Sequence, residues 1–187
     1  MLALQGDFEA HSMALARAGG EPVLARTAAD LANLDGLVIP GGESSTMLKL
    51  LELENLFEPL AGFGRLRPIF GTCAGAILLA TDVTHPSQPS LGLMNMSVER
   101  NGYGRQIDSR VAHIEPAPEF EQRTHSGELE AVFIRAPIIR RVGPDAHVLA
   151  SYQGDPVLVE QGRHLVATFH PELGSDSRVH DLFLSKL

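Results

Sequence analysis

Apolar and polar positions follow two different periods along the first half of the chain. Short, almost uniformly apolar runs, typical of buried strands, occupy residues 2–4, 22–25, 36–39 and 68–70. Between them lie longer stretches with apolar residues at helical spacing, residues 8–18, 27–34, 46–53 and 56–63. Strands that alternate with helices in this way predict an α/β fold, in which helices cover both faces of a mostly parallel central sheet.

The second half of the chain has a different pattern. Runs typical of strands lie at residues 107–114, 131–135, 148–152 and 156–161. We expect antiparallel strands and hairpins here, and therefore an antiparallel β extension of the fold. The charged, proline-marked residues 115–130 are expected to form a mobile surface loop, and residues 175–187 a closing helix.

The only cysteine of the chain, Cys73, lies between two apolar runs in the turn Gly71-Thr72-Cys73-Ala74-Gly75. The pattern is strand, sharp turn and helix, with glycines on both sides that tolerate a close backbone approach. We expect a helix to begin at Cys73, where the helix dipole favours the nucleophilic thiolate. The alternative is a small buried apolar residue, the usual role of a lone free cysteine.

An apolar strand ends at His170, and Pro171 and Glu172 follow it. Because proline does not continue a strand ladder, the chain turns here. A histidine with a carboxylate two residues later can supply the base and the orienting group that a cysteine nucleophile requires. Cys73, His170 and Glu172 are therefore a candidate catalytic triad. The alternative is that His170 and Glu172 are ordinary loop residues.

A third candidate element is the loop Pro40-Gly41-Gly42-Glu43-Ser44-Ser45, which follows an apolar strand. Two adjacent glycines leave bare backbone amides at the strand end, and bare amides suit an oxyanion hole. Ser44 or Ser45 is expected to cap the next helix. A plain Pro-Gly-Gly turn is the alternative, and the pattern of a phosphate-binding P-loop is absent from the sequence.

Composition narrows the class of function. The 187 residues suit one domain, residues 1–187, with 44% hydrophobic and 20% charged residues. A formal net charge of −8 without a long basic run argues against a nucleic-acid partner, and no apolar stretch is long enough to span a membrane. A single cysteine favours the cytoplasm, and the spacing of Cys and His predicts no metal site. We interpret seven of the eight histidines as surface or packing residues, His170 being the exception.

Short sequence blocks along almost the whole chain carry a resemblance to a known family. The blocks are Ala3-Leu4-Gln5-Gly6, Pro40-Gly41-Gly42-Glu43-Ser44-Ser45-Thr46, Gly71-Thr72-Cys73-Ala74-Gly75-Ala76, Glu99-Arg100-Asn101, Gly104-Arg105-Gln106, Phe133-Ile134-Arg135-Ala136-Pro137 and His170-Pro171-Glu172-Leu173. The chain resembles the class I, triad-type glutamine amidotransferases, and within them the glutaminase subunits of pyridoxal 5′-phosphate synthase.

The resemblance implies hydrolysis of L-glutamine to L-glutamate and ammonia. A separate synthase subunit, held in a hetero-oligomeric complex, would use the ammonia to build the vitamin B6 cofactor. The glutaminase subunit itself would need no metal or cofactor. The resemblance also implies that Cys73 forms a thioester with the substrate, that His170 protonates the departing ammonia and then activates water, and that Glu172 orients His170.

The resemblance assigns the remaining site residues as well. The amides of Ala74 and Gly42 would hold the oxyanion. Glutamine-binding positions would be Gly42, Glu43, Ser44, Arg100, Ile134 and Arg135. An arginine fork suits the substrate carboxylate, and Glu43 suits its ammonium group. Two other readings stay open, namely another Cys-His-acid hydrolase and a non-catalytic binding relative. In α/β-hydrolases the acid precedes the histidine along the chain, which is the reverse of the order here.

Overall fold

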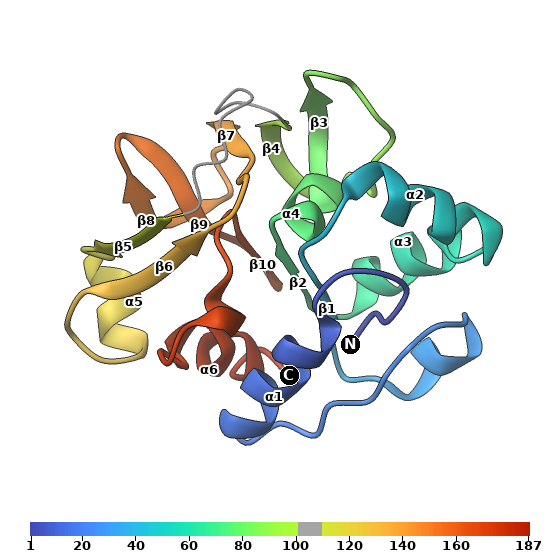
Figure 1. Ribbon diagram of the computed structural model, residues 1–187, viewed down its shortest axis with the longest axis horizontal. Coiled ribbons are helices and arrows are strands. Elements are labelled where there is room, and N and C mark those ends of the chain that lie inside the picture. Colours follow the sequence, from blue (N-terminus) through green and yellow to red (C-terminus); the bar gives the residue numbers. More distant parts are fainter. Residues whose placement is uncertain (101–109) are drawn as a thin grey trace.

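A five-stranded sheet in the order β1-β2-β10-β9-β8 forms the centre of the protein (Figure 1). The structure is a computed structural model that describes residues 1–100 and 110–187. The strands of this sheet are β1 (Leu37–Ile39), β2 (Ile69–Thr72), β10 (His164–Ala167), β9 (Asp155–Gln161) and β8 (His147–Tyr152). The first three are parallel, and β9 is antiparallel to both of its neighbours. The predicted fold class, a mostly parallel sheet with an antiparallel extension, is confirmed.

Helices cover both faces of the sheet, as predicted (Figure 1). They are α1 (Phe8–Arg17), α2 (Ser44–Leu53), α3 (Phe57–Leu66), α4 (Ala74–Leu79), α5 (Pro118–Arg123) and α6 (Arg178–Leu184), with the 3-10 turns η1 (Ala29–Asn33) and η2 (Pro171–Leu173). Successive residues of β1 enter opposite apolar clusters: Leu37 and Ile39 pack with α2, α3 and α4, and Val38 packs with α1, α5 and α6. Burial on both faces explains why these strands are continuous apolar runs.

Two smaller sheets complete the fold. One has the order β3-β4-β7, built from β3 (Ala80–Thr84), β4 (Met94–Glu99) and β7 (Ile138–Val142); the other pairs β5 (Arg110–Ile114) with β6 (Leu129–Phe133). Strands β3, β4 and β7 were not predicted. The expected strand over residues 107–114 corresponds to β5, and residues 107–109 lie outside the described part of the chain, as do Asn101 and Gly104-Arg105-Gln106.

The N-terminal segments are less regular than their sequence pattern indicates. The predicted strands at residues 2–4 and 22–25 are joined by one parallel bridge, between Leu2 and Ala25. The amide of Leu2 also donates to the carbonyl oxygen of Val38 (2.9 Å), which places this segment beside β1. The helix expected over residues 27–34 is the 3-10 turn η1.

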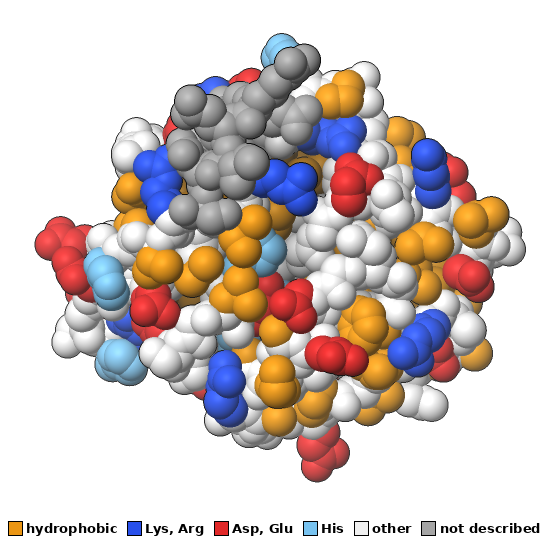
Figure 2. All heavy atoms as spheres, in the orientation of Figure 1, with side chains coloured by type: hydrophobic (Ala, Val, Ile, Leu, Met, Phe, Trp, Pro, Cys, Tyr) orange, Lys and Arg blue, Asp and Glu red, His pale blue; other side chains and the backbone are white. Residues whose placement is uncertain are grey.

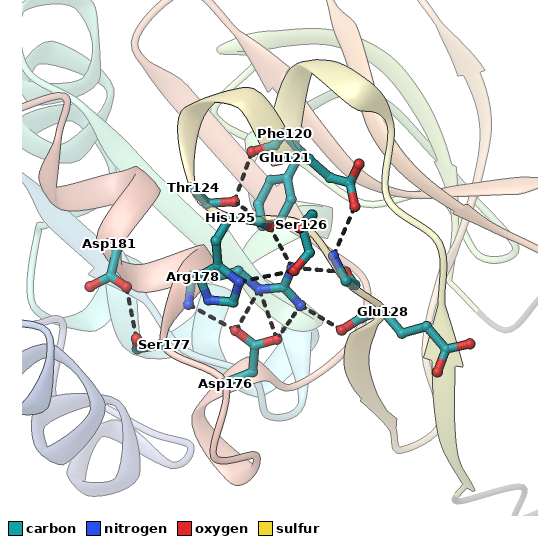
Figure 3. Close-up of polar contacts among 11 residues, drawn as sticks. Phe120, Glu121, Thr124, His125, Ser126, Glu128, Asp176, Ser177, Arg178 and Asp181 are labelled. Atoms are coloured by element: carbon teal, nitrogen blue, oxygen red, sulfur yellow. Dashed lines mark hydrogen bonds and ion pairs between the residues drawn. The ribbon is translucent and has the colours of Figure 1, made fainter.

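The prediction of a mobile loop over residues 115–130 is wrong. This segment contains α5, whose Phe120 is fully buried, and the start of β6. The buried guanidinium of Arg178 on α6 donates to three carbonyl oxygens of residues 125–128 and is held in turn by the carboxylate of Asp176 (Figure 3). The guanidinium of Arg178 therefore supplies hydrogen-bond donors to the backbone carbonyl groups of a segment whose charged composition predicts a mobile surface loop.

Candidate active site

Cys73 occupies the sharp turn between β2 and α4, with backbone angles (φ 47°, ψ −99°) that are rare for a residue other than glycine. The flanking glycines make the turn possible. A Cβ atom on Gly71 would lie 2.6 Å from the backbone of Gly75, and one on Gly75 would collide with the carbonyl oxygen of Ile39. The amide of Cys73 donates to Ala167 of β10 (2.9 Å), so the turn is fixed to the neighbouring strand.

His170 follows β10, and its amide donates to the carbonyl oxygen of Val132 in β6 (2.8 Å). Its Nδ1 atom donates to Oε1 of Glu172 at 2.7 Å, and the Glu172 carboxylate is inaccessible to solvent. Burial on its own lowers the pKa of His170, but interactions with Cys73 and Glu172 outweigh burial and raise this pKa to about 10. The imidazole is therefore held in its protonated form between the side chains of Cys73 and Glu172.

The carboxyl ends of β1, β2 and β10 meet at one edge of the central sheet, because these strands are adjacent and parallel. Ligands bind at such edges in open α/β sheets. Gly41 follows β1, and a Cβ atom on it would lie 3.4 Å from Cβ of Cys73 and would collide with the ring of His170. The three segments singled out in the sequence are thus brought together at this edge.

A cavity of about 190 Å³ opens beside Cys73 and His170. It is smaller than drug-binding pockets, which measure roughly 300–1,000 Å³, and so suits a small polar molecule. Its lining consists of Gly42, Glu43, Ser44, Cys73, Ile77, Arg100, Ile134, Arg135 and His170. Every glutamine-binding position suggested by resemblance lines this cavity, and Ile77 is an addition. A larger cavity of about 460 Å³, between the N-terminal segment and α6, contains none of these residues.

Glu43 is the N-cap of α2, and the prediction of Ser44 or Ser45 as the cap is wrong. The Glu43 carboxylate accepts hydrogen bonds from the amides and hydroxyl groups of Ser45 and Thr46. Burial acts to raise the pKa of Glu43, but these bonds lower it to about 2. A nitrogen of Arg100 lies 3.3 Å from the same carboxylate, so an ionised carboxylate and a guanidinium lie side by side in the cavity lining.

Of the two expected oxyanion donors, Ala74 directly follows the nucleophile, and Gly42 belongs to the loop whose Gly41 lies beside it. Ala74 is the first residue of α4, so its N–H has no acceptor within the helix. Gly42 lines the cavity and has φ 153°, outside the range that side chains favour. The carbonyl oxygen of Gly41 lies so close to Gly6 that a Cβ atom there would collide with it, and the Gln5 side chain accepts from the Glu43 amide (3.2 Å). The role of the Ala74 and Gly42 amides stays a prediction.

Comparison with known proteins identifies the family of this chain. A model of the SNO glutamine amidotransferase family matches residues 1–187. The chain belongs to this family. Two curated relatives are both named pyridoxal 5′-phosphate synthase subunit PdxT. The protein from Solibacter usitatus is 65% identical over 100% of this chain and 97% of its own length, and that from Koribacter versatilis is 52% identical over 98% and 92%.

Solved structures agree with the assignment to this glutamine amidotransferase family. One described as a glutamine amidotransferase is 42% identical, with a TM-score of 0.89 over 99% of this chain and 96% of its own. A second, described as a glutamine amidotransferase from Thermotoga maritima, has a TM-score of 0.60 at 16% identity over 100% and 81%, which shows likeness of fold. Family membership decides between the open readings in favour of an amidotransferase.

The described charged side chains on the surface of this amidotransferase form no large basic region on the face that Figure 2 shows. On the face shown in Figure 2, basic and acidic side chains are interspersed, and the described residues of that face form no continuous basic patch. In the described ranges, no helix is long and apolar enough to cross a membrane. Within residues 1–100 and 110–187, no three His, Cys, Asp or Glu side chains are grouped as a metal site requires.

One residue beside the candidate triad was missed in the sequence. His11 on α1 is fully buried, and its Nε2 atom lies 3.1 Å from Oε2 of Glu172. Its burial agrees with the interpretation of His11 as a packing residue, whereas its contact with the Glu172 carboxylate was not predicted. The available signal was a histidine on the apolar face of a helix, where it is buried with Ala14 and Leu15. Ile77 gave no signal, because it lies inside a uniformly apolar run.

Proposed function

We propose that this chain is the glutaminase subunit of a pyridoxal 5′-phosphate synthase. It hydrolyses L-glutamine to L-glutamate and ammonia, and a synthase subunit consumes the ammonia in vitamin B6 biosynthesis. The family match and the names of the two full-length relatives support this assignment. Because the nucleophile is a thiol that must stay reduced, the proposal places the enzyme in the cytoplasm.

In the first half-reaction, the thiolate of Cys73 attacks the side-chain amide carbon of glutamine. The carbonyl oxygen becomes an oxyanion, to which the amides of Ala74 and Gly42 donate hydrogen bonds. The protonated His170 then gives its proton to the amide nitrogen, the carbon–nitrogen bond breaks, and ammonia leaves. The products of this half-reaction are a glutamyl thioester on Cys73 and a neutral imidazole.

In the second half-reaction, neutral His170 takes a proton from water, and the resulting hydroxide attacks the thioester. The carbon–sulfur bond breaks, glutamate leaves, and the thiolate and imidazolium of the resting enzyme are restored. Glu172 accepts the Nδ1 hydrogen bond throughout. It thereby fixes the tautomer and orientation of His170 and stabilises its charged form.

The same cavity supplies recognition of a free amino acid. Arg100 and Arg135 line it and suit the α-carboxylate of glutamine, since a guanidinium binds a carboxylate in a fork geometry. The Nε atom of Arg100 is buried and has no partner among the described residues, which leaves a donor for the substrate. Glu43 suits the α-ammonium group and is held ionised by its hydrogen bonds.

The observation that carries the proposal is the imidazole of His170 between Cys73 and Glu172 at the wall of a small, arginine-lined cavity. The test is glutamate and ammonia release from L-glutamine by the chain combined with its synthase partner. Asparagine serves as the control substrate, because it is one methylene shorter. Cys73→Ala is expected to abolish turnover while it preserves binding to the synthase. Turnover that persists in this variant, or no turnover of glutamine by the complex, would refute the proposal.

A further inference from the structure

Two histidines extend the line of polar contacts of the triad into the protein interior. His11 on α1 and His180 on α6 are both fully buried, and Nδ1 of His11 lies 3.1 Å from Nε2 of His180. On its other side, Nε2 of His11 lies 2.9 Å from Oγ1 of Thr72 and 3.1 Å from Oε2 of Glu172. His11 therefore contacts both the carboxylate of the triad and the residue that precedes the nucleophile.

The surroundings fix which nitrogen of His11 carries the proton. Glu172 uses Oε1 for His170, and the Nε2 atom of His11 is the group that lies against its buried Oε2 atom. A carboxylate oxygen attracts an N–H and repels a lone pair, so the proton of His11 is on Nε2. The hydrogen bond of this nitrogen is to the hydroxyl oxygen of Thr72. The Oε2 atom of Glu172 has no hydrogen-bond partner among the described residues, so its 3.1 Å contact with His11 is an electrostatic attraction.

His180 completes the assignment. If Nε2 of His11 is the donor, Nδ1 of His11 is an acceptor, and it receives the Nε2–H of His180. The Nδ1 atom of His180 is then an acceptor, and it has no partner among the described residues. A buried acceptor without a partner is tolerated better than a buried donor without one, so this arrangement is preferred to the opposite tautomers.

Both interior histidines are neutral in this arrangement. Burial, followed by the charges of His180 and His170, holds the pKa of His11 well below its ordinary value. Burial and the nearby Arg17 lower the pKa of His180 to about 4. A neutral donor orients the Glu172 carboxylate without a positive charge of its own, and a second cation beside Glu172 would weaken its stabilisation of the His170 imidazolium.

We propose that His11 is a positioning residue of the active site: its Nε2–H holds the Oε2 atom of Glu172, so that Oε1 stays directed at His170. His180 fixes the required tautomer of His11. The inference rests on the proposed function, because it requires that Glu172 serves His170 in catalysis. It extends the line of contacts to Cys73–His170–Glu172–His11–His180, which links α1 and α6 to the reaction.

The first test is a double-mutant cycle between His11 and Glu172, measured as kcat and KM for glutamine in the complex with the synthase. His11→Leu replaces the polar N–H beside the buried Oε2 atom of Glu172 with an apolar side chain, so we expect kcat to fall on the order of tenfold, with KM changed by less than about twofold. His11→Gln can present an amide N–H at a similar reach and is expected to restore most of kcat. In a Glu172→Gln background, His11→Leu is expected to have no further effect on kcat.

His164 provides the matched control. It is a buried histidine at the opposite end of β10 from His170, where it accepts a hydrogen bond from the Ile69 amide (3.2 Å). His164→Leu is expected to lower the melting temperature and to leave kcat unchanged. If His11→Leu lowers kcat no more than His164→Leu does, or if its effect adds fully to that of Glu172→Gln, His11 has a structural role and the inference is overturned.

A spectroscopic measurement keeps the inference testable should the His11 variants fail to fold. Long-range ¹H–¹⁵N spectra of the imidazole rings of the unmodified chain are expected to show His11 as the neutral Nε2–H tautomer between pH 6 and 8. The Nδ1–H tautomer, or a protonated ring, would overturn the inference about His11 and leave the proposed function intact. Full turnover in Glu172→Gln would remove the triad itself, and the role of His11 with it.

Discussion

Gly41 lies directly against the imidazole ring of His170. A Cβ atom added to Gly41 would collide with Cε1 of this ring and lie 3.1 Å from its Nδ1 atom. We expect Gly41→Ala to push His170 away from Cys73 and to lower turnover by about 10²-fold, since a misplacement of about 1 Å costs this much. Single-turnover release of ammonia measures the effect on the step in which His170 donates its proton.

Gly62 on α3 is the control for this substitution, because a Cβ atom there would meet only the tip of Arg65, at 4.0 Å. Gly62→Ala is expected to leave turnover unchanged and to stabilise the protein by up to about 1 kcal/mol, since alanine is the better helix former. Equal turnover by the Gly41→Ala and Gly62→Ala variants would contradict the assigned contact between Gly41 and His170.

Arg100 offers a test of substrate recognition that is separate from the chemistry. Its guanidinium lines the cavity and is mostly buried beside Glu43. Arg100→Met is expected to raise KM for glutamine by about 10- to 10²-fold with a smaller change in kcat, because a charge-assisted hydrogen bond to the substrate contributes about 1.5–3 kcal/mol. Steady-state kinetics of the complex checks this split.

The control is Arg163→Met, since Arg163 is exposed and donates to the Arg65 carbonyl oxygen (3.3 Å) away from the cavity lining. Its KM should equal that of the unmodified chain. A normal KM in Arg100→Met would remove Arg100 from the glutamine site.

Buried histidines predict how stability depends on pH. Burial, and then the nearby Arg163, lower the pKa of His164 to about 4, whereas an unfolded histidine titrates near 6.5. Between pH 4 and pH 6.5 the unfolded chain binds a proton on this histidine that the native protein does not bind. The contribution of His164 to the free energy of unfolding is therefore fully present above pH 6.5 and is lost as the pH falls toward 4. The contribution of His164 between pH 7 and pH 5 is about 2 kcal/mol.

Urea unfolding at pH 7 and pH 5 measures this contribution. The unmodified chain should lose about 2 kcal/mol more of its free energy of unfolding than His164→Leu does over that interval. His170 acts in the opposite sense at higher pH. Its raised pKa stabilises the native state below pH 6.5, and this stability is lost as the pH rises toward 10. Equal losses in both proteins between pH 7 and pH 5 would show that His164 does not titrate as described.

The synthase partner is expected to raise glutaminase activity. The peptide between Gly41 and Gly42 carries no side chain on either residue, and its carbonyl oxygen faces Gly6. It can therefore rotate at little steric cost, and partner binding beside Gln5 and Gly6 can turn the Gly42 amide toward the oxyanion. One oxyanion donor contributes about 10²–10³ in kcat. Titration of the chain with synthase measures the rise, and equal turnover with and without the partner would refute this gating.

The parts of the fold that local sequence determines were predictable. Uniformly apolar runs marked β1, β2 and β10, because strands buried on both faces have no polar side. The turn around Cys73 was predictable from Gly71 and Gly75, since only glycine tolerates these backbone contacts. Placement of Cys73 and His170 at one edge of the sheet then follows from parallel strand order.

Contacts between distant segments were not predictable. The packing of residues 115–130 depends on Arg178. Along the sequence, Arg178 lies 50 positions from Glu128, the nearest residue of this segment whose carbonyl oxygen it binds. Glu43 rather than Ser44 caps α2, because its longer side chain folds back onto the first turn. His11 meets Glu172 only through the packing of α1 against η2, which no local pattern specifies.

The most direct test of the central claim is covalent labelling of the complex by an electrophilic glutamine analogue, followed by peptide mass spectrometry. Cys73 is buried at 7% exposure, and it lies at the wall of the cavity that carries the proposed glutamine site. The account predicts one label per chain, on Cys73, that excess L-glutamine prevents and that Gly41→Ala slows. Labelling on another residue, or labelling of Cys73 that glutamine does not prevent, would contradict the assignment of Cys73 as the nucleophile of a glutaminase.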